Sequence, residues 1–208
     1  MNPYDKTSIN ALIRFLDAQG NPGLGRNGRA NLSELRRAAA DPSDTRSIWI
    51  LGPLLPERDG WESDAYRLAA TLYAFHAQRF TTPDGGHKLP KFSDDGEPVT
   101  YKRRSFGESL RRLRTQLGAG EDSLDKRFVA LLDTDTENLA AHLRGFIQRI
   151  ASAQKDIPVD YGQLLTDLLN WNGNQQTLIP TPRRQWARDY WQPVTGEDDD
   201  EPFTTNAP

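Results

Sequence analysis

Apolar residues recur at the three- and four-residue spacing of an α-helix along most of this chain, and this periodicity constrains the fold more than any other feature. The fullest stripe lies in a helix expected over residues 137–154 and has five members: Leu139, Leu143, Phe146, Ile147 and Ile150. No segment alternates apolar and polar residues well enough to predict a strand. We therefore expect an all-α protein of two small helical bundles joined through a long loop.

Helix boundaries are indicated by capping residues and by proline and glycine. Ser105 followed by Glu108 has the capping-box spacing, which predicts a helix over residues 106–117. The same spacing occurs at Asn31 with Glu34 and at Asp160 with Gln163, and the latter predicts a helix over 161–171. Further helices are expected at four places: 9–20, 47–54, 62–80 and 124–132. Thr181-Pro182 predicts the start of a last helix that extends to Trp191.

The longest interruption of the helical pattern lies between residues 81 and 101, where proline, glycine and charged residues predominate. Loops of that length are uncommon inside a compact domain and often mark a boundary. We predict an N-terminal bundle over residues 1–80, a linker over 81–104 and a C-terminal bundle over 105–193. Residues 194–208 include five consecutive acids at 197–201 and are expected to form a disordered acidic tail.

Composition and motifs argue against several classes of function. The chain has no cysteine, which excludes disulfides and thiol nucleophiles, and no apolar run of membrane-spanning length. Residues 23–28 formally match G-x-G-x-x-G, but a helix precedes them, so we interpret them as an interhelical loop. Residues 133–137 lack the later ligands of a calcium loop and are interpreted as an acidic turn that caps the next helix. We expect no catalytic residue, no metal, no cofactor and no membrane contact, and a cytoplasmic location.

Paired basic residues are the one unusual chemical feature. They occur at five places: Arg36-Arg37, Arg103-Arg104, Arg111-Arg112, Lys126-Arg127 and Arg183-Arg184. Glu34 can reach Arg37 and Glu108 can reach Arg112 through local helical pairing. Arg103, Arg111 and Arg114 have no comparable local acid, and a guanidinium matches the geometry of a phosphate. These three are therefore the better candidates for contact with an anionic partner.

Tryptophan could add stacking to such a contact, because five tryptophans occur in the chain and aromatic rings stack on bases. Packing is the commoner role for buried aromatic residues. We interpret Trp186, Tyr190 and Trp191 as an anchor that packs the last helix onto the second bundle.

Five stretches, in order along residues 12–191, together resemble one known family. They are GRANLSELRRA at 28–38, SFGESLRRL at 105–113, KRFVALL at 126–132 with LAAHLR at 139–144, VDYGQLLTDLLNW at 159–171, and RQWARDY at 184–190. The chain is similar in these stretches to the CasB family, the small subunit of the type I-E CRISPR Cascade surveillance complex. The family pattern does not account for two segments, the long insertion at residues 81–101 and the acidic tail.

The resemblance implies a non-catalytic subunit that helps to hold the guide–target hybrid and the displaced non-target strand of the R-loop in antiviral defence. Its expected partners are the backbone and large subunits of Cascade, guide RNA, target DNA and further copies of itself, associated head to tail. The residues expected to bind nucleic acid are Arg29, Arg36, Arg103, Arg104, Arg111, Arg114, Arg127 and Arg144. On this basis Arg111→Glu is expected to weaken target binding while leaving assembly intact.

Two other classes of function remain open at this stage. A purely structural scaffold subunit of a ribonucleoprotein would use its arginines against acidic faces of partner proteins. A free-standing helical DNA-binding regulator would need a helix-turn-helix, and the sequence contains no convincing one.

Overall fold

The computed structural model describes residues 6–20, 26–40, 45–57, 60–77, 104–118, 121–172 and 182–193, and the regular elements in these ranges are all helical. The predicted all-α class is confirmed. In chain order the elements are α1 (Lys6–Gly20), α2 (Arg26–Ala40), α3 (Arg46–Leu51), the 3-10 turn η2 (Gly52–Leu54), α4 (Trp61–His76), α5 (Phe106–Leu117), α6 (Glu121–Asp133), α7 (Thr136–Ala151), α8 (Tyr161–Leu169) and α9 (Pro182–Trp191).

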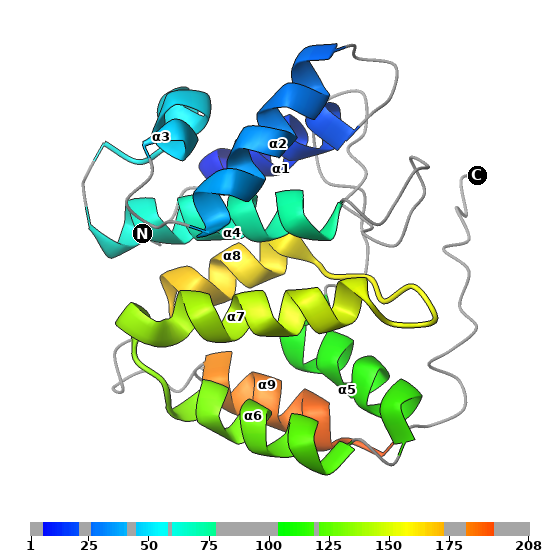
Figure 1. Cartoon of the computed structure of the whole chain (residues 1–208). Coiled ribbons are helices and arrows are strands. Elements are labelled where there is room, and N and C mark those ends of the chain that lie inside the picture. The colour runs from blue at the N-terminus through cyan, green and yellow to red at the C-terminus, as the bar shows by residue number, and fades with distance from the viewer. Residues whose placement is uncertain are drawn as a thin grey trace, which may run out of the picture.

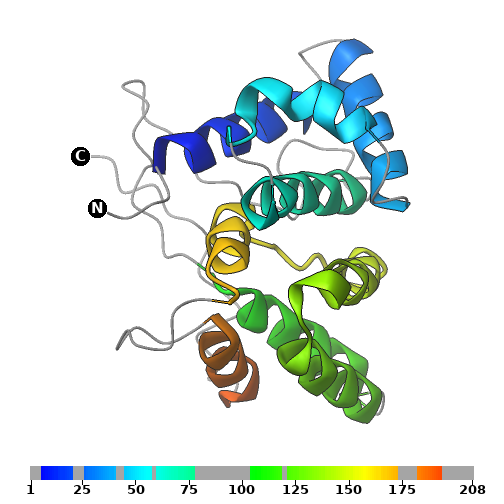
Figure 2. The same ribbon diagram turned by 90° about the vertical axis from the view of Figure 1, so that its left-hand side faces the viewer.

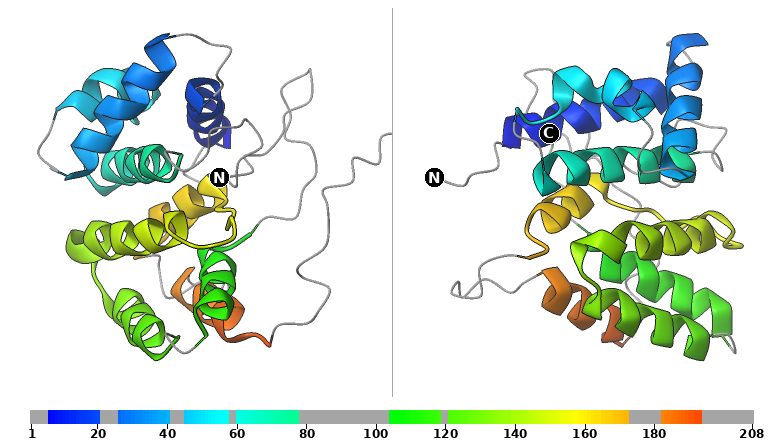
Figure 3. Two further views of the ribbon diagram at one scale, coloured as in Figure 1. Left: turned by 45° about the vertical axis from the view of Figure 1, so that its right-hand side comes forward. Right: turned by 60° about the vertical axis from the view of Figure 1, so that its left-hand side comes forward.

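The helices are arranged around α4, which crosses the middle of the molecule (Figure 1). In that view α1, α2 and α3 lie above α4, whereas α7 and α8 lie directly below it and α5, α6 and α9 form the lowest part. Figures 2 and 3 show the same order from other sides. Helix α4 packs against α2, α7 and α8, and α1 also packs against α8.

One continuous hydrophobic core extends through both halves of the chain. Residue Tyr161 of α8 illustrates the connection, since its ring lies edge-on to Tyr73 of α4 with the centroids 5.3 Å apart. The indole N–H of Trp61 on α4 donates to the carbonyl oxygen of Leu168 on α8 at 2.8 Å. The predicted linker lies almost wholly outside the described residues, so its role as a boundary stays a prediction.

Three predicted helix starts are confirmed by hydrogen bonds at their caps. The hydroxyl of Ser105 accepts from the backbone N–H of Glu108 at 3.3 Å, and α5 has the predicted bounds. The carboxylate of Asp160 accepts from the N–H of Gln163 at 2.8 Å at the start of α8. The acidic turn before α7 also has the predicted role, because Asp135 accepts from the N–H of Asn138 at 3.0 Å.

The predicted start of α2 is wrong. The helix begins at Arg26, so Asn31 lies inside it, and its side-chain amide donates to Gln19 of α1 at 2.9 Å. Gly28 is therefore helical instead of part of a loop. Its lack of a side chain lets α1 and α2 cross closely, because a Cβ there would lie 2.8 Å from the carbonyl oxygen of Gln19. The prediction that Asn31 caps the helix relied on local sequence spacing, and local spacing does not reveal a crossing between two helices.

Side chains expected in the core are mostly found there. The five apolar residues of α7 are all buried, as are Trp186 and Tyr190 of α9. Trp191 is an exception, because 48% of its surface is exposed. The anchor on α9 thus consists of Trp186 and Tyr190, and Trp191 faces outward. Helices α4 and α8 also end earlier than predicted, at His76 and Leu169.

Candidate nucleic-acid interface

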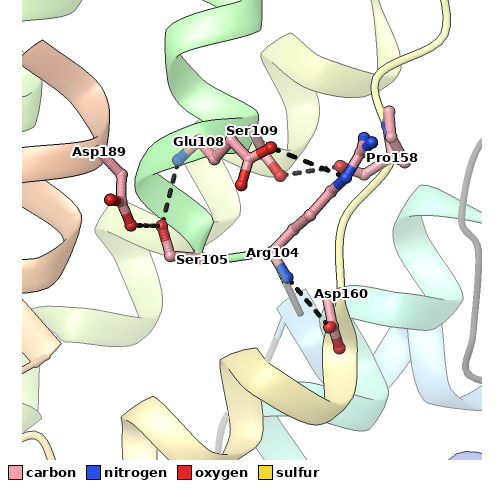
Figure 4. Close-up of polar contacts among 7 residues, drawn as sticks. All are labelled: Arg104, Ser105, Glu108, Ser109, Pro158, Asp160 and Asp189. Carbon is pink, nitrogen blue, oxygen red and sulfur yellow. Dashed lines mark hydrogen bonds and ion pairs between the residues drawn. The ribbon is translucent and has the colours of Figure 1, made fainter. Parts of the chain in front are cut away.

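Three residues before and at the start of α5, Arg104, Ser105 and Ser109, connect this helix to α9 and to the segment before α8 (Figure 4). The hydroxyl of Ser105 donates to the carboxylate of Asp189 on α9, and the hydroxyl of Ser109 donates to the carbonyl oxygen of Pro158 at 2.8 Å. The backbone N–H of Arg104 donates to Asp160, the cap of α8, at 3.4 Å. These bonds fix the first turn of α5 to the segment before α8 and to α9.

Arg104 is also engaged through its side chain. Its Nε lies 3.7 Å from a carboxylate oxygen of Glu108, and the side chain is 19% exposed. The predicted strand contact at Arg104 therefore competes with an internal ion pair. Arg103, its predicted neighbour in that contact, lies outside the described residues.

Arg111 and Arg114 have no local acid on α5, as predicted, but the tertiary structure gives each of them a partner. Arg111 is only 7% exposed, and its Nη1 donates to the carbonyl oxygen of Pro193 at 3.4 Å. Arg114 donates from Nε and Nη2 to the two carboxylate oxygens of Asp125, at 2.9 and 3.3 Å. Asp125 comes from α6, which folds back along α5, so local spacing could not reveal it. Because Arg111 is buried, Arg111→Glu would destabilise the fold. A loss of target binding in that variant would therefore not identify Arg111 as a strand contact.

Arg36, another predicted contact, bonds to the end of a neighbouring helix. Its Nη1 donates to the carbonyl oxygen of Ala74 in the last turn of α4 at 3.5 Å, and burial lowers the pKa of its guanidinium. Arg183 does the same at the last turn of α6, where it donates to the carbonyl oxygen of Leu132 at 3.1 Å. Helix ends carry unsatisfied carbonyls and partial negative charge, so both arginines have a structural role there.

A different set of basic side chains remains available. Arg29 on α2 and Arg127 on α6 are exposed, as predicted contacts should be, and Arg144 on α7 is half-buried. The Nε of Arg144 is buried and has no hydrogen-bond partner in the described part of the chain. Arg127 forms no hydrogen bond or ion pair with any of the described residues.

Arg127 lines a pocket of about 260 Å³ between α6 and α7. The lining residues are Arg127, Ala130, Ala141, His142, Gly145, Phe146 and Arg149. Three of the seven are arginine or histidine, three are glycine or alanine, and none is acidic. We call this site the α6–α7 groove.

His142 and Arg149 belong to this site but were not predicted from the sequence. The two residues are seven positions apart on α7 and so share one helical face, and this spacing was the signal available. Their approach to Arg127 depends on how α6 packs on α7, and no local pattern encodes that packing.

The groove has the chemistry of a phosphate-binding surface. Guanidinium groups hold phosphate oxygens through paired hydrogen bonds, and the small side chains allow a sugar–phosphate backbone to approach closely. Contacts of this kind supply affinity and salt dependence but do not read the base sequence. In the regions that the structure describes, no group of three or more His, Asp or Glu is placed to hold a metal, and no helix is long and apolar enough to cross a membrane.

The fold and the groove define a class: an all-helical protein with one shared core and a basic groove that has no acidic residue in its lining. The family model for CRISPR-associated protein Cse2 matches residues 31–191, and the chain belongs to this family. The resemblance to CasB is thereby confirmed.

Individual relatives agree with this assignment. The CRISPR-associated protein Cse2 of Thermus thermophilus is 29% identical over 169 residues, which are 79% of this chain and 80% of the relative. The crystal structure of M. ruber CasB is 28% identical, with a TM-score of 0.59, over 90% of this chain and 94% of that one. A Cse2-family crystal structure from Thermus thermophilus is 26% identical, with a TM-score of 0.60, over 86% of this chain and 96% of that one.

Proposed function

We propose that this chain is the non-catalytic small subunit of a type I-E CRISPR Cascade complex, and that it binds nucleic-acid backbone to stabilise the guide–target hybrid and the displaced strand. The observation that carries the proposal is the α6–α7 groove, whose lining contains Arg127 and Arg149 and no acidic residue. Contact with the backbone and large subunits, head-to-tail self-association and a cytoplasmic location belong to the same proposal.

Such a groove can be effective because R-loop formation involves only a small net change in free energy. The hybrid that forms is about as stable as the duplex that it replaces, so modest contacts to phosphates can shift the equilibrium. The target sequence varies while its phosphates do not, and a groove without base-reading side chains suits that requirement.

The test is the affinity of a guide-loaded complex for target duplex across a salt series, with Arg127→Glu and Arg149→Glu combined in this subunit. We expect weaker binding and a salt slope reduced by about two, one for each lost phosphate contact. Arg37→Glu is the control for charge reversal, because Arg37 is exposed on α2, away from the groove, where it pairs with Glu34 at 2.8 Å. Intact assembly with an unchanged slope would refute the proposal.

A scaffold role is the second candidate, and one observation favours it. Trp49 is 90% exposed and Ile48 45% exposed on α3, which is far more apolar surface than a short helix usually presents to water. If α3 docks on another subunit, Trp49→Ala would prevent incorporation into the complex and the groove variant would incorporate normally. Incorporation measured by size-exclusion chromatography separates the two roles.

A further inference from the structure

The outer face of α9 combines two cations with an exposed aromatic ring. Arg184, Arg188 and Trp191 follow the i, i+4, i+7 spacing that places residues on one helical face, and all three are exposed. The opposite face is the buried anchor of Trp186 and Tyr190. We call this outer face the α9 ridge.

No acid in the helix neutralises this ridge. The one acidic residue of α9, Asp189, accepts hydrogen bonds from Ser105 at the start of α5 and from Gln185 of α9, and the bond to Ser105 holds it toward α5. Neither Arg184 nor Arg188 forms a hydrogen bond or ion pair with the described residues.

The indole of Trp191 is held in place although it is half-exposed. The guanidinium carbon of Arg114 lies 5.2 Å from the centre of the indole, and Arg114 is itself fixed by Asp125 at 2.9 Å. The ring of Tyr190 meets the indole nearly edge-on, at 85°, with centroids 4.8 Å apart. A ring positioned in advance loses little conformational freedom when a ligand stacks on it.

We propose that the α9 ridge binds single-stranded nucleic acid, with an unpaired base stacked on the indole of Trp191 and flanking phosphates bound by Arg184 and Arg188. Aromatic stacking accepts any base, because every base has a π face, and it requires bases that are not paired. The inference rests on the proposed function for the class of ligand, but it adds a second site on another helix and a preference for unpaired strands.

Charge separates this ridge from the other exposed tryptophan. Trp49 on α3 lies beside the apolar Ile48, and the nearby Arg46 is paired with Glu34 at 3.2 Å. Charge complementarity with a phosphate backbone therefore exists at Trp191 and not at Trp49. Trp49 thus serves as the matched control.

The experiment compares two labelled strands of equal length and charge, an oligo-dT strand and an abasic strand, bound to the full-length chain and measured by fluorescence anisotropy. We expect the wild-type chain to bind oligo-dT about tenfold more tightly than the abasic strand, as one stacked base would give. Trp191→Ala should remove this preference, Trp191→Phe should retain most of it, and Trp49→Ala should leave it unchanged. Arg188→Ala should weaken the binding of both strands by a similar factor.

Two results would overturn the inference: equal affinity of the wild-type chain for the two strands, or a preference that persists in Trp191→Ala. Failure to bind either strand would overturn it as well. None of these outcomes decides the proposed function, which depends on Arg127 and Arg149 and on the salt slope of the assembled complex. Trp191→Phe guards against misfolding, because it keeps an aromatic ring against Arg114 and Tyr190.

Discussion

Replacement of Gly107 by alanine should destabilise the protein through a collision between two helix backbones. Gly107 lies in the first turn of α5, where that helix crosses α9, and a Cβ at this position would lie 2.2 Å from the carbonyl oxygen of Trp186. The Cα and carbonyl carbon of Trp186 would also be only 2.7 and 2.8 Å away. The obstacle is backbone, so no side-chain rotation can relieve it.

Two opposing effects set the size of the change. Alanine is favoured over glycine within a helix by at most about 1 kcal/mol, and less in the first turn. To reach ordinary contact near 3.4 Å the helices must separate by about 1 Å, which disturbs the Ser105–Asp189 hydrogen bond and the packing of Phe106 on Trp186. Overpacking of this kind costs about 1–3 kcal/mol, and more where backbone must move. We therefore expect a net loss of about 2 kcal/mol.

Urea unfolding of the purified chain measures the change, and a loss of about 2 kcal/mol lowers the midpoint by about 1 M for an m-value near 2 kcal/mol/M. Gly145→Ala is the matched control, because a Cβ at that position in the middle of α7 meets no atom within 4 Å. That variant should gain about 0.5–1 kcal/mol from helix propensity alone. If Gly107→Ala is as stable as wild type, the conclusion that α5 and α9 cross too closely to admit a side chain at residue 107 is wrong.

Two further predictions concern internal polar contacts, those of Asp167 and those of Arg114. Burial raises the pKa of Asp167 to about 6, against the lowering effect of hydrogen bonds from Trp186 and Gln163, so its contribution to stability is full at acid pH and is lost as the pH rises through about 6. When the pH is raised from 5 to 7.5, the free energy of unfolding of the wild type should therefore fall by about 1 kcal/mol relative to that of Asp167→Asn. If the difference between the urea midpoints of the two proteins is the same at both pH values, this assignment is wrong. Arg114→Ala should lower the free energy of unfolding in urea by about 1 kcal/mol because it removes the partly buried pair with Asp125, yet it should leave the salt slope of target binding unchanged. A reduced salt slope in this variant would show that Arg114 contacts a phosphate.

The sequence by itself determined the helical class, the apolar stripes and several helix starts. These features depend on contacts between residues three or four positions apart, and such contacts can be read from spacing alone. Ser105, Asp135 and Asp160 cap their helices as their local sequences predict, and the stripe from Leu139 to Ile150 is buried. The family resemblance was also available from the order of the five stretches.

Tertiary structure alone decided which arginines are occupied and which are available. Arg114 has its acid on α6, and Arg36 bonds to the end of α4. Arg127 and Arg149 line one pocket only because α6 lies along α7. The same holds for Gly28, where α2 crosses α1 too closely to admit a side chain, and for Trp191, which faces outward while its neighbour Tyr190 is buried. Each of these depends on which helices become neighbours, and that is set by packing of the whole core, since helical periodicity specifies the buried face of a helix but not the helix that covers it.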